Sequence, residues 1–510
     1  MKKRAFTAVL AVVLAAGILA GCGSSGSEGS TATSSSGDTS AAASGKGDMV
    51  TLNLYIPTLA TYSEDAIDDV QNAISDYTAE KYGWKVALNY TEIGNFEQKI
   101  NLAMTTDDLD VTCYFTDSGQ LANYAHNNQL LDITDYFANA SDDLKNTFTD
   151  AEIQATTLDG KMYGLVRKYQ YGGAECVVMN KDIVDELGID PSTITDMDSL
   201  EKVLYEVHEK YPDIYAIVPQ SSSDMTWIDP FVKGIGLTSY AYTEYTPEMD
   251  ATTLKSVFDT DSLKEFCSYT HKWYQDGLVM QDAVSNTQEG SDMVTSGAAF
   301  CCFHNFDIDP LEDIYPNTVC SPALTVAFAG PTDIGNLQYG ISSNSSHPDE
   351  SFELLSALYT DAKLETFLAY GIEGEHYVIG EDGKADYPEG MTAENEPYGG
   401  FSATAVYPNY LILPVKESAT VDDYEKAVDD WNNSVKVSPT MGFYFDTADF
   451  TDFVTAYQNI EDKYLNALET GSIGYDDVID QIHDELSDIG FDDVLEKTQT
   501  QLDSFLQGES

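Results

Sequence analysis

The sequence predicts an α/β protein with two lobes, and three observations support this prediction. The chain has 510 residues, 43% of them hydrophobic, so it is too long for one ordinary core and can supply two. Between residues 50 and 115 apolar strands alternate with amphipathic helices, a rhythm typical of a largely parallel sheet. From residue 420 to the end the pattern is mainly helical.

The first 22 residues have the parts of an export signal, namely a basic start, an apolar run over 5–20 and a small-residue site. The run of about 16 residues falls short of the roughly 20 that a membrane span needs. Its end, Leu19-Ala20-Gly21-Cys22, resembles a bacterial lipobox, in which cleavage precedes a lipidated cysteine. An ordinary signal peptide with a chance cysteine is the alternative.

The segment that follows is a tether. Residues 23–48 are rich in Gly, Ser, Thr and Ala and have almost nothing to bury. We therefore expect a signal peptide at 1–21, a lipidated Cys22 with a flexible linker at 22–48, and folding from Met49.

The folded part is predicted element by element from its hydrophobic periodicity. Ligands bind open parallel sheets at loops beyond the carboxyl ends of strands, which here are 57–62 and 116–119. The first lobe is expected to hold strands at 50–56, 84–93 and 110–115, and helices between 63 and 83 and at 96–104. Later strands are expected at 160–166, 175–179, 298–303 and 336–342, and later helices at 180–188, 263–276 and 348–370.

The charge is strongly negative. The chain has 25 Lys+Arg against 86 Asp+Glu, a net −61, and loss of the three basic residues at its start makes it −64. Such a field repels nucleic acid and anionic lipid headgroups, so no nucleic-acid partner is expected.

Six cysteines remain when Cys22 is set apart. They are sparse, none forms a CxxC pair, and an even number outside the cell permits disulfides. We expect mostly buried small side chains with at most one bridge, and the pairing is open among Cys113, Cys176, Cys267, Cys301, Cys302 and Cys320.

Two stretches carry a family resemblance. GKMYGLV…VVMNKDIVDEL, within residues 160–187, resembles the crossover of bacterial extracellular solute-binding proteins of ABC importers. The longer stretch GNLQYGISSNSSHPDESFELLSALYTD with YGIEGEHY, within 335–377, is similar to the oligosaccharide-type branch of family 1, which has an extra C-terminal domain of unassigned function. Trp431-Asn432-Asn433 and PTMGFYF at 439–445 fit the same branch, so the resemblance covers nearly all of 49–508.

The resemblance implies a hinged two-lobe fold of the periplasmic-binding-protein type 2, with a mainly helical C-terminal region. It also implies an oligosaccharide ligand, a separate ABC permease, and attachment to the outer face of the cell membrane through the lipid on Cys22. A monomer without a cofactor is expected. The implied division is lobe 1 at 49–165, lobe 2 at 166–315, a return to lobe 1 at 316–400, and a C-terminal domain completing lobe 2 at 401–510.

The candidate ligand-binding residues are loop aromatics and nearby polar groups. Sugar CH faces stack on aromatic rings, and sugar hydroxyls hydrogen-bond to carboxylates, amides and guanidinium groups. Each of these residues could instead serve packing or a surface pair. The candidates are Trp227, Asp229, Asp117, Tyr398, Tyr407, Trp431, His304, Asp307 and Arg167.

Catalysis and metal binding have little support in the sequence. HExxH and GxSxG motifs are absent, and no pair among the 86 carboxylates is singled out. Asp307-Ile308-Asp309 lacks EF-hand spacing, so no metal site is predicted. The alternatives that stay open are a receptor for a peptide or another small solute, a surface-anchored glycan hydrolase, and a chemosensory receptor subunit.

Overall fold

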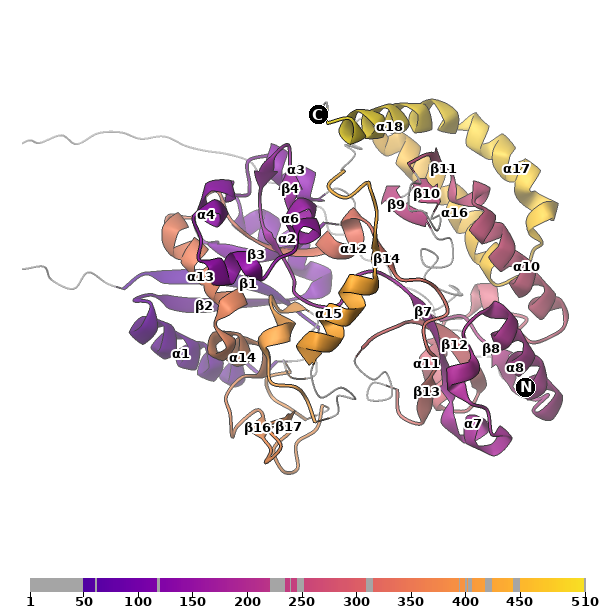
Figure 1. The fold of residues 1–510 in the computed structure, drawn as a ribbon, viewed down its shortest axis with the longest axis horizontal. Helices are drawn as coiled ribbons and strands as arrows, with labels where there is room; N and C mark the ends of the chain where they lie inside the picture. Colours follow the sequence, from indigo (N-terminus) through magenta and orange to yellow (C-terminus); the bar gives the residue numbers. More distant parts are fainter. Residues whose placement is uncertain are drawn as a thin grey trace, which may run out of the picture. The chain divides into compact units, whose positions relative to one another are not determined.

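The computed structural model describes residues 49–59, 62–116, 120–220, 234–238, 240–244, 252–308, 315–393, 395–399, 401, 406–417, 424–443 and 450–508. Figure 1 shows how the helices and strands of this part are arranged. Cys22 and the tether lie outside the described residues. Among the residues described, none of the helices combines the length and apolar character that a membrane span requires.

The first sheet has the strand order β2-β1-β3-β15-β6. The first three strands are parallel, as the alternating pattern predicts, whereas β15 runs antiparallel to both of its neighbours. Figure 1 shows α1 and α14 beside this sheet. The strands are β1 (Thr51–Thr58), β2 (Lys85–Glu92), β3 (Val111–Phe115), β6 (Leu165–Val166) and β15 (Leu337–Ile341).

Helices cover the first sheet, and local signals set their ends. The Ser63 hydroxyl accepts a hydrogen bond from the backbone N–H of Ala66 and so caps α1, as predicted. Smaller elements of this region are β4 (Thr157–Leu158), β5 (Lys161–Met162), β16 (Val378–Ile379) and β17 (Ala385–Asp386). The helices are α1 (Glu64–Lys81), α2 (Ile93–Ala103), α3 (Gln120–His126), α4 (Thr134–Ala138), α5 (Asp142–Asn146), α6 (Asp150–Ala155), α13 (Pro348–Thr360) and α14 (Ala362–Tyr370).

The single helix predicted over 348–370 is two helices that meet at Asp361. The backbone of Asp361 is extended, and its carboxylate accepts from the N–H groups of Lys363 and Leu364, so it caps α14. The same carboxylate binds the Lys81 ammonium at 2.7 Å. The break therefore supplies a buried acceptor that joins α14 to α1.

The second sheet has the order β13-β7-β12-β8 and its own core. Its central strands β7 and β12 are antiparallel and buried. Its strands are β7 (Glu175–Asn180), β8 (Tyr215–Ile217), β12 (Ala299–Asn305) and β13 (Thr318–Cys320). Its helices are α7 (Lys181–Leu187), α8 (Met197–Lys210), α10 (Asp261–Gln275) and α11 (Gly290–Thr295).

The C-terminal helices form a further core with a small sheet. Figure 1 shows these helices in yellow near the short strands. The buried apolar side chains come from both segments, for example Tyr240 and Phe258 against Tyr457 and Phe491. The elements are β9 (Gly234–Thr238), β10 (Ala241–Glu244), β11 (Leu254–Lys255), α16 (Thr451–Glu469), α17 (Tyr475–Asp488) and α18 (Phe491–Leu506).

Three segments leave or re-enter the first core side by side and are hydrogen-bonded to one another: two run between the first two sheets, and the third leads on to the C-terminal helices. The first, residues 167–174, leaves β6 for β7, and its Gly173 pairs with Phe328 of the returning segment. That segment holds β14 (Phe328–Ala329) and α12 (Pro331–Gly335). The third segment follows α15 (Tyr424–Ser434) and contains β18 (Lys436–Val437), which pairs with β14.

The cores also bear on the predicted domain boundaries. Thr318–Cys320 still belongs to the second sheet, after the boundary predicted at 315. Buried residues after 401, such as Tyr407, Val428 and Met441, pack in the core of the first sheet. The boundaries at 165, 315 and 400 stay predictions. The residues that pack in the core of the first sheet nevertheless extend past 401.

Candidate ligand-binding site at the crossing segments

A cavity of about 280 Å³ lies where the crossing segments meet. Its lining comes from the first crossing, from the end of β12, and from the returning segment around α12. Both hydrogen-bonding and aromatic side chains line it. The polar members are Arg167, Gln170, Asn305, Asp307, Asp333 and Asn336, and the aromatic members are Tyr169, Tyr171, Phe306 and Phe328.

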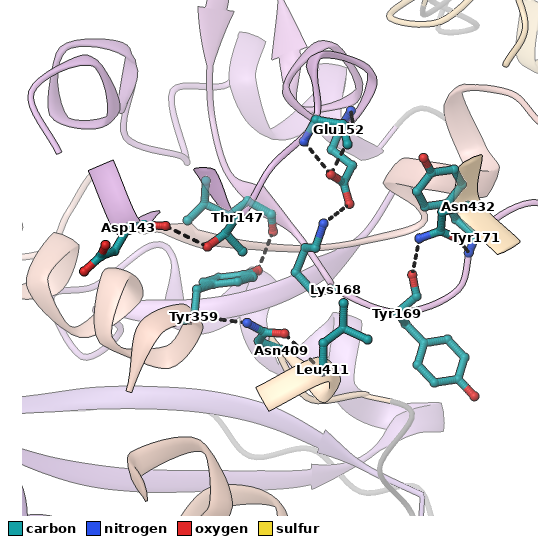
Figure 2. Close-up of polar contacts among 12 residues, drawn as sticks. Asp143, Thr147, Glu152, Lys168, Tyr169, Tyr171, Tyr359, Asn409, Leu411 and Asn432 are labelled. Atoms are coloured by element: carbon teal, nitrogen blue, oxygen red, sulfur yellow. Dashed lines mark hydrogen bonds and ion pairs between the residues drawn. The ribbon is translucent and has the colours of Figure 1, made fainter. Parts of the chain in front are cut away.

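A buried ion pair holds the start of the first crossing (Figure 2). The Lys168 ammonium lies 2.5 Å from the Glu152 carboxylate, and the two side chains are 9% and 0% exposed. The other Glu152 oxygen accepts from the backbone N–H and hydroxyl of Thr149, at 2.7 and 2.9 Å. Lys168 thus points into the first core, while its neighbours Arg167 and Tyr169 line the cavity.

Helix α15 holds the other end of the same segment. The Asn432 amide oxygen accepts from the backbone N–H of Tyr171, and its amide nitrogen donates to the carbonyl of Tyr169, both at 3.1 Å (Figure 2). The Trp431 indole N–H donates to the Tyr171 carbonyl at 2.9 Å, and its ring stacks on Phe306 at 4.8 Å. Trp431 therefore ties the first crossing to the residues that follow β12.

The charged groups of the cavity are organised around Tyr169. The Arg167 guanidinium lies over the Tyr169 ring at 4.4 Å, and the Tyr169 hydroxyl donates to both Asp307 oxygens at 2.8 and 3.1 Å. Burial lowers the pKa of Arg167, and the nearby Tyr169 and Asp307 partly oppose this shift. The ordinary pKa of a guanidinium is so high that Arg167 still stays protonated. One cation and two carboxylates therefore share a small, aromatic-walled space, which suits an uncharged ligand rich in hydroxyl groups.

Asp333 is the titratable group of this cavity with a pKa near neutrality. Burial raises its pKa to about 6, although the backbone N–H of Gly330 donates to it at 2.6 Å and opposes the rise. The folded state therefore binds this proton more tightly than the unfolded state. Stability from this group is complete below about pH 4 and is lost as the pH rises through about 6.

We expect Asp333→Asn to remove this pH dependence of the free energy of unfolding. Its size should be about 1–3 kcal/mol, because solvent around the partly exposed side chain reduces the effect. The amide oxygen of Asn can still accept from Gly330, so the turn into α12 is kept. Urea unfolding at several values between about pH 4 and pH 7 measures the effect. Asp185→Asn, at an exposed carboxylate paired with Lys181, is the control. An identical pH slope in wild type and Asp333→Asn would contradict the assignment.

The structure brings three of the sequence-predicted site residues together at the cavity. Arg167 and Asp307 line it, and Trp431 stacks on Phe306 of its wall. His304 lies next to this group, but its ring bonds to the Asn305 carbonyl and the Tyr315 hydroxyl instead, and burial lowers its pKa. Trp227, Asp229, Asp117 and the lipidation site Cys22 lie outside the described residues.

The structure places Tyr398 and Tyr407 elsewhere, in the first core. They are 1% and 0% exposed, and their hydroxyls bond to Tyr90 and Tyr62, respectively. No face of either ring is open to a ligand in this conformation. Tyr398 and Tyr407, chosen for their ability to stack on a sugar, instead pack in the first core.

Sequence reasoning did not select several lining residues, namely Tyr169, Gln170, Tyr171, Phe306, Asp333 and Asn336. Two of the stretches that hold them, 167–173 and 304–307, stood out because each joins an apolar strand to a polar loop. The usable signal was that each stretch adjoins an apolar strand, β7 or β12. Asp333 and Asn336 carried no local signal, because their place depends on the pairing of Phe328 with Gly173.

Residues 60–364 match the family model described as bacterial extracellular solute-binding protein. The chain belongs to this family. Residues 439–507 of this solute-binding protein match a domain of unknown function, DUF3502. The predicted family and its extra C-terminal domain are thus confirmed.

This solute-binding protein is similar to a carbohydrate ABC transporter substrate-binding protein of Streptococcus pneumoniae serotype 4, with 26% identity over 532 aligned residues that cover 100% of this chain and 99% of the relative. A crystal structure of the N-glycan transport solute binding protein of Streptococcus pneumoniae has a TM-score of 0.77 at 20% identity, covering 90% of this chain and 100% of that one. The same relative in complex with Man1GlcNAc has a TM-score of 0.67 at 21% identity, covering 90% and 99%. These structures confirm the predicted two-lobe fold.

Proposed function

We propose that this protein binds an oligosaccharide between its two lobes and delivers it to a separate ABC permease. The observation that carries the proposal is the polar, aromatic-walled cavity at the segments that join the lobes. A ligand that contacts both lobes there favours the closed arrangement by its differential affinity for it. The carbohydrate relative named above supports a sugar as the ligand.

The receptor has no catalytic function and acts as a monomer. The lipid on Cys22 holds it at the outer face of the cell membrane. The export signal and the tether at 23–48 support the anchor, and an anchored receptor meets its permease at a raised effective concentration. Mature protein from native membranes should partition into detergent, and a chain produced from Gly23 onward, without signal or lipid, should partition into water. Partition of the native protein into water without detergent would overturn the anchor.

Titration calorimetry with a panel of neutral oligosaccharides tests the function. We expect tight binding without any product. Asp307→Asn should weaken binding roughly 10- to 100-fold, because the ligand loses a charge-assisted acceptor. Asp159→Asn, exposed on the first lobe, is the matched control and should bind as wild type does. Turnover of a glycan, or binding of peptides in place of glycans, would contradict the proposal.

Trp227→Ala should weaken glycan affinity by about 1–3 kcal/mol with little change in melting temperature. The reason is that the sugar loses its apolar contact with the indole ring. Calorimetry and thermal unfolding together measure this. Trp273, fully buried in α10, supplies the contrast, since Trp273→Phe should lower the melting temperature and leave affinity unchanged. Unchanged affinity with a large drop in melting temperature in Trp227→Ala would place Trp227 in a core.

A further inference from the structure

Three cysteines gather on one face of the second sheet, on the adjacent strands β7, β12 and β13. Figure 1 labels these strands. Val178 of β7 pairs with Cys302 on one side and with Cys320 on the other. Cys176 lies two residues before Val178, so its side chain leaves β7 on the same face. None of the three forms a disulfide in the part of the chain that the structure describes.

Cys176 and Cys320 lie close together on this face, because Cys320 pairs with Val178, two residues after Cys176. The neighbouring Cys320 thiol together with burial raises the pKa of Cys176 well above its ordinary value. The two residues are diagonal neighbours across an antiparallel pair, where α-carbons typically lie about 7–8 Å apart. A disulfide needs roughly 4.4–6.8 Å, so the α-carbons must approach by about 1 Å.

Strand β13 can supply this movement. It has three residues, it lies at the edge of the sheet, and Cys320 is its last residue. Cys320 is also partly exposed, whereas Cys176 and Cys302 are fully buried. A reagent in solution therefore reaches Cys320 first, and Cys176 is its diagonal neighbour on β7.

We propose that Cys176 and Cys320 are a redox site that closes to a disulfide when the protein meets a small-molecule disulfide oxidant outside the cell. The Cys320 thiolate attacks the oxidant and releases one thiol, which leaves a mixed disulfide. The Cys176 thiol gives up its proton and attacks the Cys320 sulfur, which releases the second thiol. Two protein thiols become one disulfide, and one oxidant molecule becomes two thiols. Proteins of this family are extracellular, and disulfides persist outside the cell.

The bond would join two of the three crossings at their second-lobe ends. Cys176 lies just after Ala174, the end of the first crossing, and Cys320 lies just before the returning segment that contains Phe328. Ala174 and Phe328 both line the cavity. Oxidation therefore tightens the frame of the ligand site without changing a lining residue.

Peptide mapping of the full chain carrying Cys22→Ala tests the site. The folded protein is incubated with oxidised glutathione at mildly alkaline pH, alkylated, denatured, digested and analysed by mass spectrometry without reduction. We expect one peptide pair, joined through Cys176 and Cys320, with the loss of two hydrogen atoms. Thermal unfolding should shift upward on oxidation and return on reduction, because the bond restricts the unfolded chain.

Single variants separate this pair from its neighbour. Cys320→Ala and Cys176→Ala should each abolish the bridge, whereas Cys302→Ala should keep it. Mapping of the protein without these changes decides the question even if a buried variant fails to fold. A bridge to Cys302, glutathione retained on Cys320, a bridge between two chains, or complete alkylation of the six core cysteines would each overturn the proposal.

Discussion

Lys168→Ala should lower the free energy of unfolding by about 3–5 kcal/mol. The reason is that Glu152 is 0% exposed and Lys168 is its only charged partner among the contacts described here, at 2.5 Å. Removal of the ammonium leaves a buried carboxylate whose remaining acceptor bonds come from Thr149. Urea unfolding followed by circular dichroism measures the loss.

An exposed pair in the same lobe is the matched control. Lys161 and Asp132 are 3.7 Å apart, with side chains 56% and 39% exposed, so Lys161→Ala should cost less than about 1 kcal/mol. The double change Lys168→Met with Glu152→Gln should recover part of the loss, because it removes both buried charges. Equal, small losses for Lys168→Ala and Lys161→Ala would show that burial does not govern this pair.

Gly471→Ala should destabilise the protein by roughly 3–6 kcal/mol and loosen the C-terminal helices from α10. Gly471 has φ +74°, a conformation that L side chains rarely adopt. An added Cβ would also lie 2.1 Å from the Thr270 carbonyl oxygen, which belongs to the backbone of α10. Unfolding curves with a probe in the C-terminal region measure both effects.

Gly490 separates the two causes. It has φ +77°, but an added Cβ would meet nothing within 4 Å. Gly490→Ala should therefore cost only the conformational part, about 1–2 kcal/mol. If both variants lose the same amount, the close approach of Gly471 to α10 contributes nothing to stability.

Much of the fold follows from local pattern. The strands predicted at 84–93 and 175–179 match β2 and β7 within one residue at each end, because alternation and flanking turn residues define them. The break at Asp361 was missed, because the apolar periodicity of the helix continues across it. The Asp361 carboxylate that caps α14 is also held by Lys81, Tyr77 and Tyr82, which are distant in the sequence.

The candidate site was less predictable than the fold. Arg167 stood out as a cation in an otherwise acidic chain and Asp307 as an acceptor for sugar hydroxyl groups, and the structure places both at the cavity. Tyr407 looked equally suitable, yet its hydroxyl meets that of Tyr62, which is 345 residues away in the chain. Sequence patterns report whether a residue can stack or hydrogen-bond, whereas long-range packing decides which partner it meets.

The threefold crossing also affects how the molecule can be made. Strand β15, at 337–341, lies between β3 and β6, so the first sheet is incomplete until more than half of the chain exists. The first core further needs Met441, and the C-terminal core needs Leu502. These two cores therefore cannot mature until late residues are made, whereas the core of the second sheet draws only on residues 176–324. Until those residues are made, two of the three cores lack part of their buried surface and the corresponding segments of the chain stay open.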